Sequence, residues 1–179
     1  MKRFLLLFLS SFLFIGIVDA QQADSYDLAV GLKFQKTEQL YWENGVGVDY
    51  TSGFLFDKQV HLTLGYVTSR LGSAMIGNAV KQDNYLLGAD WHFRSKKDFQ
   101  ILAGINTGFF HADMEIPQFE VLPHNSMLLS LETGLYYRFK FPASASLTVG
   151  YNLITGDGMT TPGTLFPLFY QLSVYYRLK

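Results

Sequence analysis

The chain has 179 residues, no cysteine and a formal net charge of −1, which suits one domain and excludes disulfides and thiolate metal sites. This near-neutral charge balance gives no indication of nucleic-acid binding. Charged residues make up 16% of the sequence, against about 25% in a soluble domain, and aromatic residues make up another 16%. A chain of this composition has too few polar side chains to cover a surface that faces water on all sides.

Residues 1–20 have the pattern of a secretory signal peptide. Two cations at the start precede an apolar run, and residues 18–20 (Val-Asp-Ala) form a small-residue cleavage site. The alternative is a transmembrane helix, but the apolar run is shorter than the roughly 18 residues that such a helix needs. We therefore expect an exported protein whose single domain comprises residues 21–179.

The first stretch after the signal peptide, residues 25–35, alternates in character. Large apolar residues such as Leu28 and Val30 stand at every second position, between small or polar residues such as Asp27 and Lys33. A period of two predicts a β-strand with one apolar and one polar face. Seven more stretches share this period, and no helical period appears after residue 20. In chain order, the eight predicted strands are residues 25–35, 41–51, 58–69, 81–94, 98–110, 126–140, 145–155 and 166–178.

The predicted connections alternate in length along the chain. Those after the second, fourth and sixth strands are short, and those after the third, fifth and seventh are longer. Short turns at one end and longer loops at the other are typical of an outer-membrane β-barrel. The longest connection is residues 111–125.

The polar faces of the predicted strands are also the small ones. The interior of an eight-stranded barrel is only wide enough for its own side chains, so the small face belongs inside and the apolar face outside. An apolar outer wall suits lipid, and closure of the sheet pairs every backbone group without water. We therefore predict an all-β fold, an eight-stranded antiparallel up-and-down transmembrane β-barrel; the alternative is a soluble lipocalin-like barrel. Seven of the eight strands carry a glycine on the small face, namely Gly31, Gly47, Gly65, Gly88, Gly104, Gly134 and Gly150.

With eight alternating strands, short turns and longer loops, residues 24–179 resemble the small eight-stranded bacterial outer-membrane barrels, the class of the OmpA barrel, OmpX and OmpW. The resemblance implies a Gram-negative outer membrane as the location. It also implies contact with outer-membrane lipid and lipopolysaccharide, and folding by the barrel-assembly machinery. In this class the last strand commonly ends in an aromatic residue that the machinery reads, whereas this chain ends in VYYRLK.

Charged residues on the inward face must be paired, because a buried charge without a partner is costly. We expect Asp49 to lie opposite His61, His61 to lie near His92, and Asp27 to reach Arg177. The resulting network is predicted to plug the lumen. Two alternatives stay open, a narrow ion or proton path and a metal site formed by the two histidines with a nearby aspartate. The predicted lumen charges are Asp27, Lys33, Asp49, His61, Asp90, His92, Arg94, Glu132, Arg138, Lys140 and Arg177.

A third alternative is an enzyme, because some eight-stranded outer-membrane barrels are lipid A deacylases with a His-x-Ser pair. Here His124 and Ser126 match that pair and Glu132 follows downstream. Their positions predict that they face the lumen rather than the lipid, and Glu132 lies roughly 20 Å along the strand from Ser126. We therefore expect no enzymatic activity, no cofactor and no metal.

The longest predicted loop is the main candidate for binding at the surface. Apolar residues on an exposed loop suggest contact with lipopolysaccharide or with another envelope protein, whereas the alternative is packing over the mouth of the barrel. A role in envelope integrity or surface binding, or as a subunit of a secretion or conjugation apparatus, fits such loops. The loop candidates are Met114, Ile116, Phe119, Val121 and Leu122.

Overall fold

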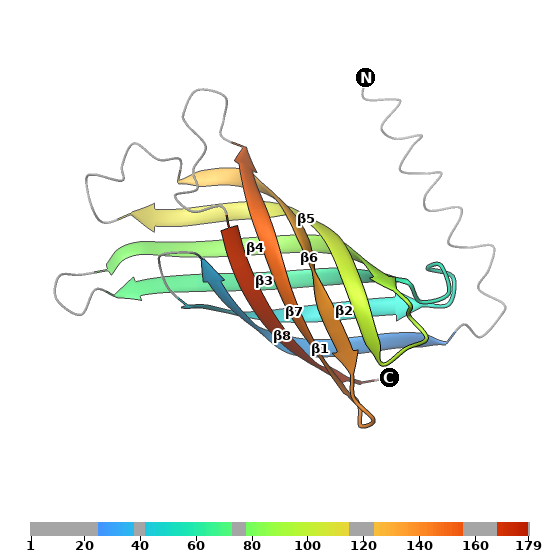
Figure 1. Cartoon of the computed structure of the whole chain (residues 1–179). Coiled ribbons are helices and arrows are strands. Elements are labelled where there is room, and N and C mark those ends of the chain that lie inside the picture. Colours follow the sequence, from blue (N-terminus) through green and yellow to red (C-terminus); the bar gives the residue numbers. More distant parts are fainter. Residues whose placement is uncertain (1–24, 38–41, 73–77, 115–123, 156–167, 179) are drawn as a thin grey trace, which may run out of the picture.

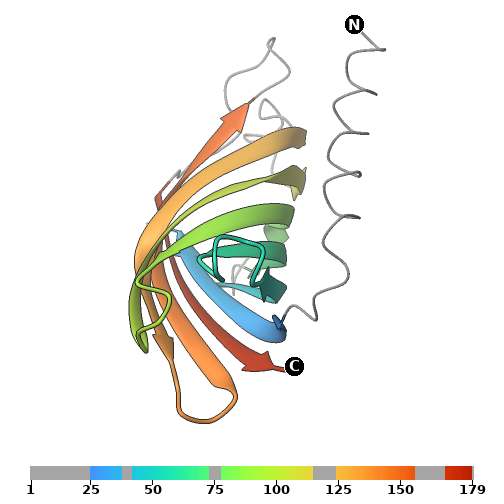
Figure 2. The same cartoon turned by 90° about the vertical axis from the view of Figure 1, so that its right-hand side faces the viewer.

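The computed structural model describes residues 25–37, 42–72, 78–114, 124–155 and 168–178. They form a closed antiparallel barrel in which each strand pairs with the next in the sequence and the first pairs with the last. The strands are tilted and wrap around a common interior (Figures 1 and 2). This confirms the predicted fold class. The strands are β1 (Tyr26–Thr37), β2 (Trp42–Ser52), β3 (Val60–Gly72), β4 (Asn78–Phe93), β5 (Phe99–Met114), β6 (Asn125–Arg138), β7 (Ala143–Thr155) and β8 (Leu168–Arg177).

The strands follow the predicted order, but several bounds differ, and the connection after β3 (73–77) is shorter than the turn after β2 (53–59), against the prediction. β4 begins at Asn78 and β5 ends at Met114, so both extend beyond their predicted ends. Met114 was expected in a loop and instead ends β5, where its backbone pairs with Val80. We call the end that carries the turns 53–59, 94–98 and 139–142 the short-turn end, and the opposite end the long-loop end. No helix in the described part of the chain is long and apolar enough to cross a membrane.

The orientation of the two strand faces is the predicted one. On β6, Leu131 is 51% exposed and its neighbour Glu132 is 8% exposed. The same contrast holds between Leu32 and Lys33 on β1, where the apolar side chain is the exposed one. The polar face therefore lines the interior and the apolar face forms the outer wall. An outer wall of this kind suits contact with hydrocarbon rather than with water.

Inward glycines make room for long side chains that cross the lumen. Gly31, Gly47 and Gly65 lie in register across β1, β2 and β3. A Cβ atom on Gly47 would lie 2.8 Å from the Tyr175 hydroxyl and 3.0 Å from Cε of Lys33. The first distance is too short for a real Cβ and the second is tight, so a side chain at Gly47 would force Tyr175 or Lys33 to shift.

The turn between β2 and β3 contains three consecutive residues with positive φ: Phe56 (52°), Asp57 (56°) and Lys58 (61°). The left-handed region costs about 1–2 kcal/mol for each residue that carries a Cβ. The turn holds this backbone with internal hydrogen bonds, among them Asp57 N to Gly53 O at 3.0 Å. Phe56 also packs against Trp91, with ring centroids 5.2 Å apart.

Asp57→Gly is therefore expected to raise the free energy of unfolding by about 1 kcal/mol, because glycine adopts this backbone without strain. The ion pair lost with Asp57 joins it to Lys96 between two strongly exposed side chains, so that loss costs little. Urea unfolding of the folded protein in detergent micelles, followed by tryptophan fluorescence, measures the change. The matched control is Asp98→Gly in the next turn, where φ is not positive and glycine should slightly destabilise.

Candidate functional site

The lumen is the candidate functional site. Its lower part, which is the part nearer the short-turn end, contains two stacked histidines at its centre. His61 on β3 and His92 on β4 have ring centroids 3.8 Å apart with an angle of 14° between their planes. Nδ1 of His61 lies 2.9 Å and 3.0 Å from the two carboxylate oxygens of Asp49. The edge of Tyr136 closes against both rings. The structure thus brings Asp49, His61 and His92 together as the sequence predicted.

Gln100, which the sequence analysis did not single out, ties the histidine stack to a turn. Its Oε1 accepts a hydrogen bond from Nδ1 of His92 at 2.9 Å. Its Nε2 donates to the backbone oxygens of Ser95 and Lys97, at 3.0 Å and 2.8 Å. The sequence could have indicated Gln100, because it is a polar residue at an inward-facing position just after a short turn. Gln100 therefore connects the floor of the lumen to the 94–98 turn.

The stack does not suit shared metal binding. The nitrogen lone pairs of an imidazole lie in its ring plane, so two nearly parallel stacked rings cannot direct them at one ion. Among the described residues, no group of three or more His, Asp or Glu side chains is arranged to hold a metal ion. The arrangement favours packing over the metal-site alternative.

Lys33 lies in the middle of the lumen among three carboxylates. It lines the same interior space as Asp49, Asp90 and Glu132. Asp90 lies in register with Gly104, and Gly104 with Glu132, so the two acids flank a bare stretch of β5. The free volume among these side chains is about 20 Å³, which is room for a single water molecule. The lumen is thus tightly packed at this level, but within the described residues no ion pair of 4 Å or less joins Lys33 to these acids, so the predicted charge pairing is not seen here.

Neutral polar side chains from β5, β6 and β7 line the lumen next to Glu132. Asn106 donates from Nδ2 to Oε1 of Glu132 at 2.7 Å, and Ser130 donates to Oδ1 of Asn152 at 2.8 Å. Glu132 is therefore held by an amide on the neighbouring strand. The second carboxylate oxygen of Glu132 and one oxygen of Asp90 are buried without a hydrogen-bond partner.

The upper part of the lumen also holds apolar side chains, beside polar ones such as Asn84 and Ser126, whereas the strand pattern predicts a polar interior. Leu128 and Phe169 interrupt the alternation of their strands with apolar residues at positions of the polar face. They point inward and are almost fully buried. Polar contacts line the lumen beside these side chains, where Gln35 donates to Glu43 at 2.5 Å. The apolar layer consists of Val67, Phe110, Ala112, Leu128 and Phe169.

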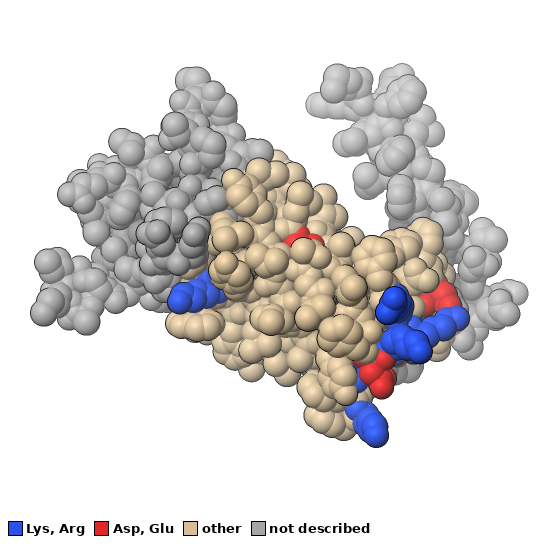
Figure 3. All heavy atoms as spheres, viewed as in Figure 1, with Lys and Arg blue, Asp and Glu red and all other residues tan. Residues whose placement is uncertain are grey.

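The short-turn end differs from the prediction in three respects. Asp27 pairs with Lys58 at 3.1 Å, although it lines the same opening as Arg177 and Arg138. Arg94 lies beyond the end of β4, where φ is 61°, and is exposed. Lys140 is also exposed, in the 139–142 turn. Arg94 and Lys140 stand at sequence positions that would point inward if the strands continued. The strands end before them, so neither residue is a lumen charge. Cations gather at this end of the molecule (Figure 3).

The His-x-Ser pair is not assembled into a triad. Nδ1 of His124 lies 3.1 Å from the backbone oxygen of Ala112, and Ser126 donates to the backbone oxygen of Met127 at 3.2 Å. Ser126 is buried on the inward face and Glu132 is bound by Asn106. The loop candidates Ile116, Phe119, Val121 and Leu122, and the signal-peptide cleavage site, lie outside the described residues, as does the side chain of Met114.

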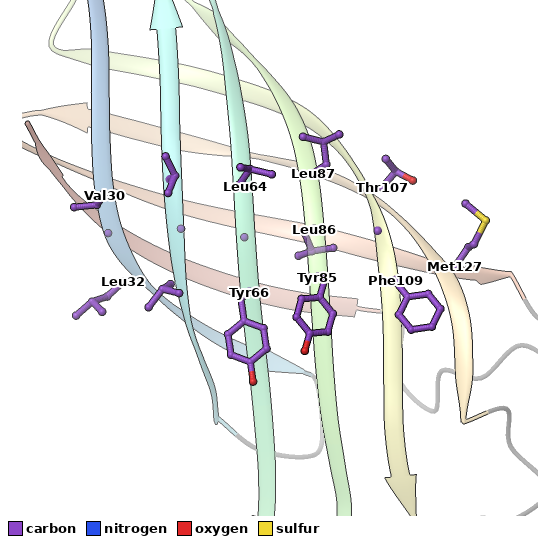
Figure 4. Close-up of a pocket in the computed structure, with 16 residues that line it drawn as sticks. Val30, Leu32, Leu64, Tyr66, Tyr85, Leu86, Leu87, Thr107, Phe109 and Met127 are labelled. Carbon is purple, nitrogen blue, oxygen red and sulfur yellow. The ribbon is translucent and has the colours of Figure 1, made fainter. Parts of the chain in front are cut away.

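The outer wall carries an apolar groove over β1 to β6 (Figure 4). Leu64 and Leu87 line one side, and Tyr66, Tyr85 and Phe109 line the other. Tyr66 and Tyr85 pack together, with ring centroids 5.2 Å apart. The Tyr66 hydroxyl and Thr68 both donate to one oxygen of Asp83, at 2.8 Å and 2.6 Å, so polar groups begin just beyond the tyrosines. An aromatic row between an apolar wall and a polar edge is typical of the membrane interface.

Comparison with solved structures identifies the class that this fold defines. The N-terminal β-barrel domain of Pseudomonas aeruginosa OprF superimposes with a TM-score of 0.63 at 11% identity, covering 87% of this chain and 99% of that one. Neisserial surface protein A (NspA) gives 0.58 at 14% identity, over 88% of this chain and 99% of that one. Outer membrane protein H (OprH) of P. aeruginosa gives 0.56 at 15% identity, over 85% and 99%.

These similarities confirm the architectural resemblance to the small eight-stranded outer-membrane barrels. At this level of identity they show the fold and not the activity. No protein-family model and no curated protein matches the sequence.

Proposed function

We propose that this chain is a non-enzymatic outer-membrane barrel with a sealed lumen, which acts in envelope integrity or in surface binding through its loops. The observation that carries the proposal is the filling of the interior at two levels. A charged and polar plug occupies the lower lumen, and an apolar layer lies above it. A solute would have to displace both, and the free volume beside Lys33 is about 20 Å³.

In this proposal the short-turn end faces the periplasm and the long-loop end faces the outside, as is usual for such barrels. The exposed leucines of the outer wall contact the hydrocarbon, and the loops are the part available to partners. The proposal leaves no role for Ser126 as a nucleophile, because its hydroxyl is buried and bound to backbone.

The sealed lumen predicts that the folded protein is silent in a planar lipid bilayer. Conductance steps should be absent at moderate salt, and they should remain absent in Phe110→Ala, because the polar plug stays in place when the apolar layer is thinned. Single-channel recording measures this. Regular steps from the wild type that change in Glu132→Gln would instead support the narrow-path alternative.

The loop role is tested in cells. A strain without the gene should show increased uptake of a bulky apolar dye if the protein supports the envelope. Complementation with a chain whose residues 115–123 are replaced by a Gly-Ser segment of equal length separates the two roles. Full rescue would indicate that the barrel itself supports the envelope, and lost rescue with a folded barrel would assign the role to that loop.

A further inference from the structure

The turn between β4 and β5 presents three exposed cations at the short-turn end. Arg94, Lys96 and Lys97 follow directly after β4, and the turn is closed by a hydrogen bond from Lys97 N to Arg94 O at 2.8 Å. The neighbouring 53–59 turn adds Lys58, and the acids of the two turns are Asp57 and Asp98. Together the two turns carry a formal excess of two positive charges, one of which Asp27 on β1 offsets through its ion pair with Lys58. They account for part of the positive charge that gathers at this end (Figure 3).

Directly above these cations, the outer wall is hollowed. Trp91 lies in register with Ala103, and Ala89 lies in register with Ile105, so each large side chain faces a small one on the next strand. The two alanines form the floor of a hollow of about 300 Å³, which Val60 also lines. Its lining is almost entirely apolar. This hollow lies on the face that we assign to the hydrocarbon.

The cations and the hollow are joined by an aromatic pair and an ion pair. Phe56 from the 53–59 turn packs on Trp91 at the edge of the hollow, with ring centroids 5.2 Å apart. Lys96 pairs with Asp57 at 3.0 Å, which links the two turns. Trp91 precedes Arg94 by three residues, and the strand ends at Phe93, so the two lie at most roughly 10 Å apart along the backbone. A phospholipid has its phosphate and the upper part of its acyl chains separated by a similar distance.

We propose that this face binds one anionic phospholipid, with its phosphate at the cations of the 94–98 turn and an acyl chain in the hollow beside Trp91. The inference rests on the proposed membrane location. Charge complementarity favours an anionic headgroup, since each Lys or Arg near a membrane surface contributes to attraction of acidic lipids. The hollow requires hydrocarbon at the same site, which an acidic soluble protein would not supply. Aromatic residues at the rim suit the interface between the two regions.

The experiment is native mass spectrometry of the folded protein, released from nanodiscs of phosphatidylcholine with a minor share of phosphatidylglycerol. The wild type should retain one phosphatidylglycerol in preference to phosphatidylcholine. Arg94→Gln and Lys97→Gln should each lower the apparent affinity about five-fold. Ala103→Leu should also release the lipid, because its side chain fills the hollow. The matched controls are Lys140→Gln, in another turn, and Ala145→Leu, on the outward face of β7, which should retain it.

The outcomes separate this inference from the proposed function. A protein that folds in nanodiscs but retains both lipids equally would overturn the lipid site and leave the membrane barrel intact. Equal loss in Lys140→Gln and Lys97→Gln would also overturn it, because the attraction would then be general and not local. A protein that does not enter nanodiscs at all would overturn the membrane location and the lipid site together.

Discussion

Lys33→Met is expected to lower the free energy of unfolding by about 2–3 kcal/mol, because it removes the cation that lines the same interior space as three acidic side chains. Lys33 is 4% exposed and shares its interior space with Asp49, Asp90 and Glu132. Methionine has a similar volume, so the loss reports the charge and not a cavity. Urea unfolding in detergent micelles, followed by tryptophan fluorescence, measures it.

The matched control for this substitution is Lys36→Met, three residues further along β1. Lys36 is exposed and its ammonium lies 5.8 Å from the centroid of the Trp42 ring. Losing this contact should cost no more than about 1 kcal/mol. Equal effects of the two substitutions would show that the lumen charges contribute no more than surface charges, and the plug would lose its energetic basis.

The second large effect is expected from Gly134→Ala on β6. A Cβ at this position would meet the backbone of β7, 2.7 Å from Cα of Thr148 and 2.9 Å from the carbonyl carbon of Leu147. Backbone cannot move aside as a flexible side chain does, so we expect a loss of about 3 kcal/mol or failure to close the barrel. The band shift between unheated and heated samples on a denaturing gel, together with urea unfolding, measures the outcome.

Gly65→Ala is the matched control. It adds the same methyl group, but the nearest atom there belongs to a flexible side chain and not to the backbone. The nearest atom would be Nζ of Lys33 at 3.3 Å, followed by Cβ of Leu86 at 3.6 Å. Alanine should be neutral here, or stabilise by up to about 1 kcal/mol through the unfolded chain. If both glycines tolerate alanine equally, the close approach of β6 and β7 is not what requires Gly134.

The sequence predicts the barrel well because alternation and turn length are local properties. Asp49 lies opposite Thr63 rather than opposite His61 as predicted, but the two inward side chains are close enough for Asp49 and His61 to meet. The position of a strand end is less local. In the alternating pattern, Arg94 and Lys140 fall at inward-facing positions. The chain leaves the sheet before each of them, so the alternation no longer determines where they point.

The apolar layer could not be inferred from alternation alone. Leu128 and Phe169 break the period of two, and a break has the same appearance whether a strand fades or an apolar side chain turns inward. Register distinguishes the cases, because Phe169 faces Gly150 on the next strand, where the missing side chain leaves space for its ring. Partners set by the tertiary fold, such as Gln100 for His92, likewise required the structure.

The central claim is that the apolar face of the sheet contacts lipid while the polar face lines the interior. Because the chain has no cysteine, single cysteines can carry a spin label at successive positions of β6 in lipid vesicles. Labels at Leu129, Leu131 and Leu135 should collide often with oxygen and rarely with a water-soluble nickel chelate, while Ser130 and Glu132 should be shielded from both. Frequent collision of the leucine positions with the nickel chelate, or shielding of those positions from oxygen, would contradict this orientation.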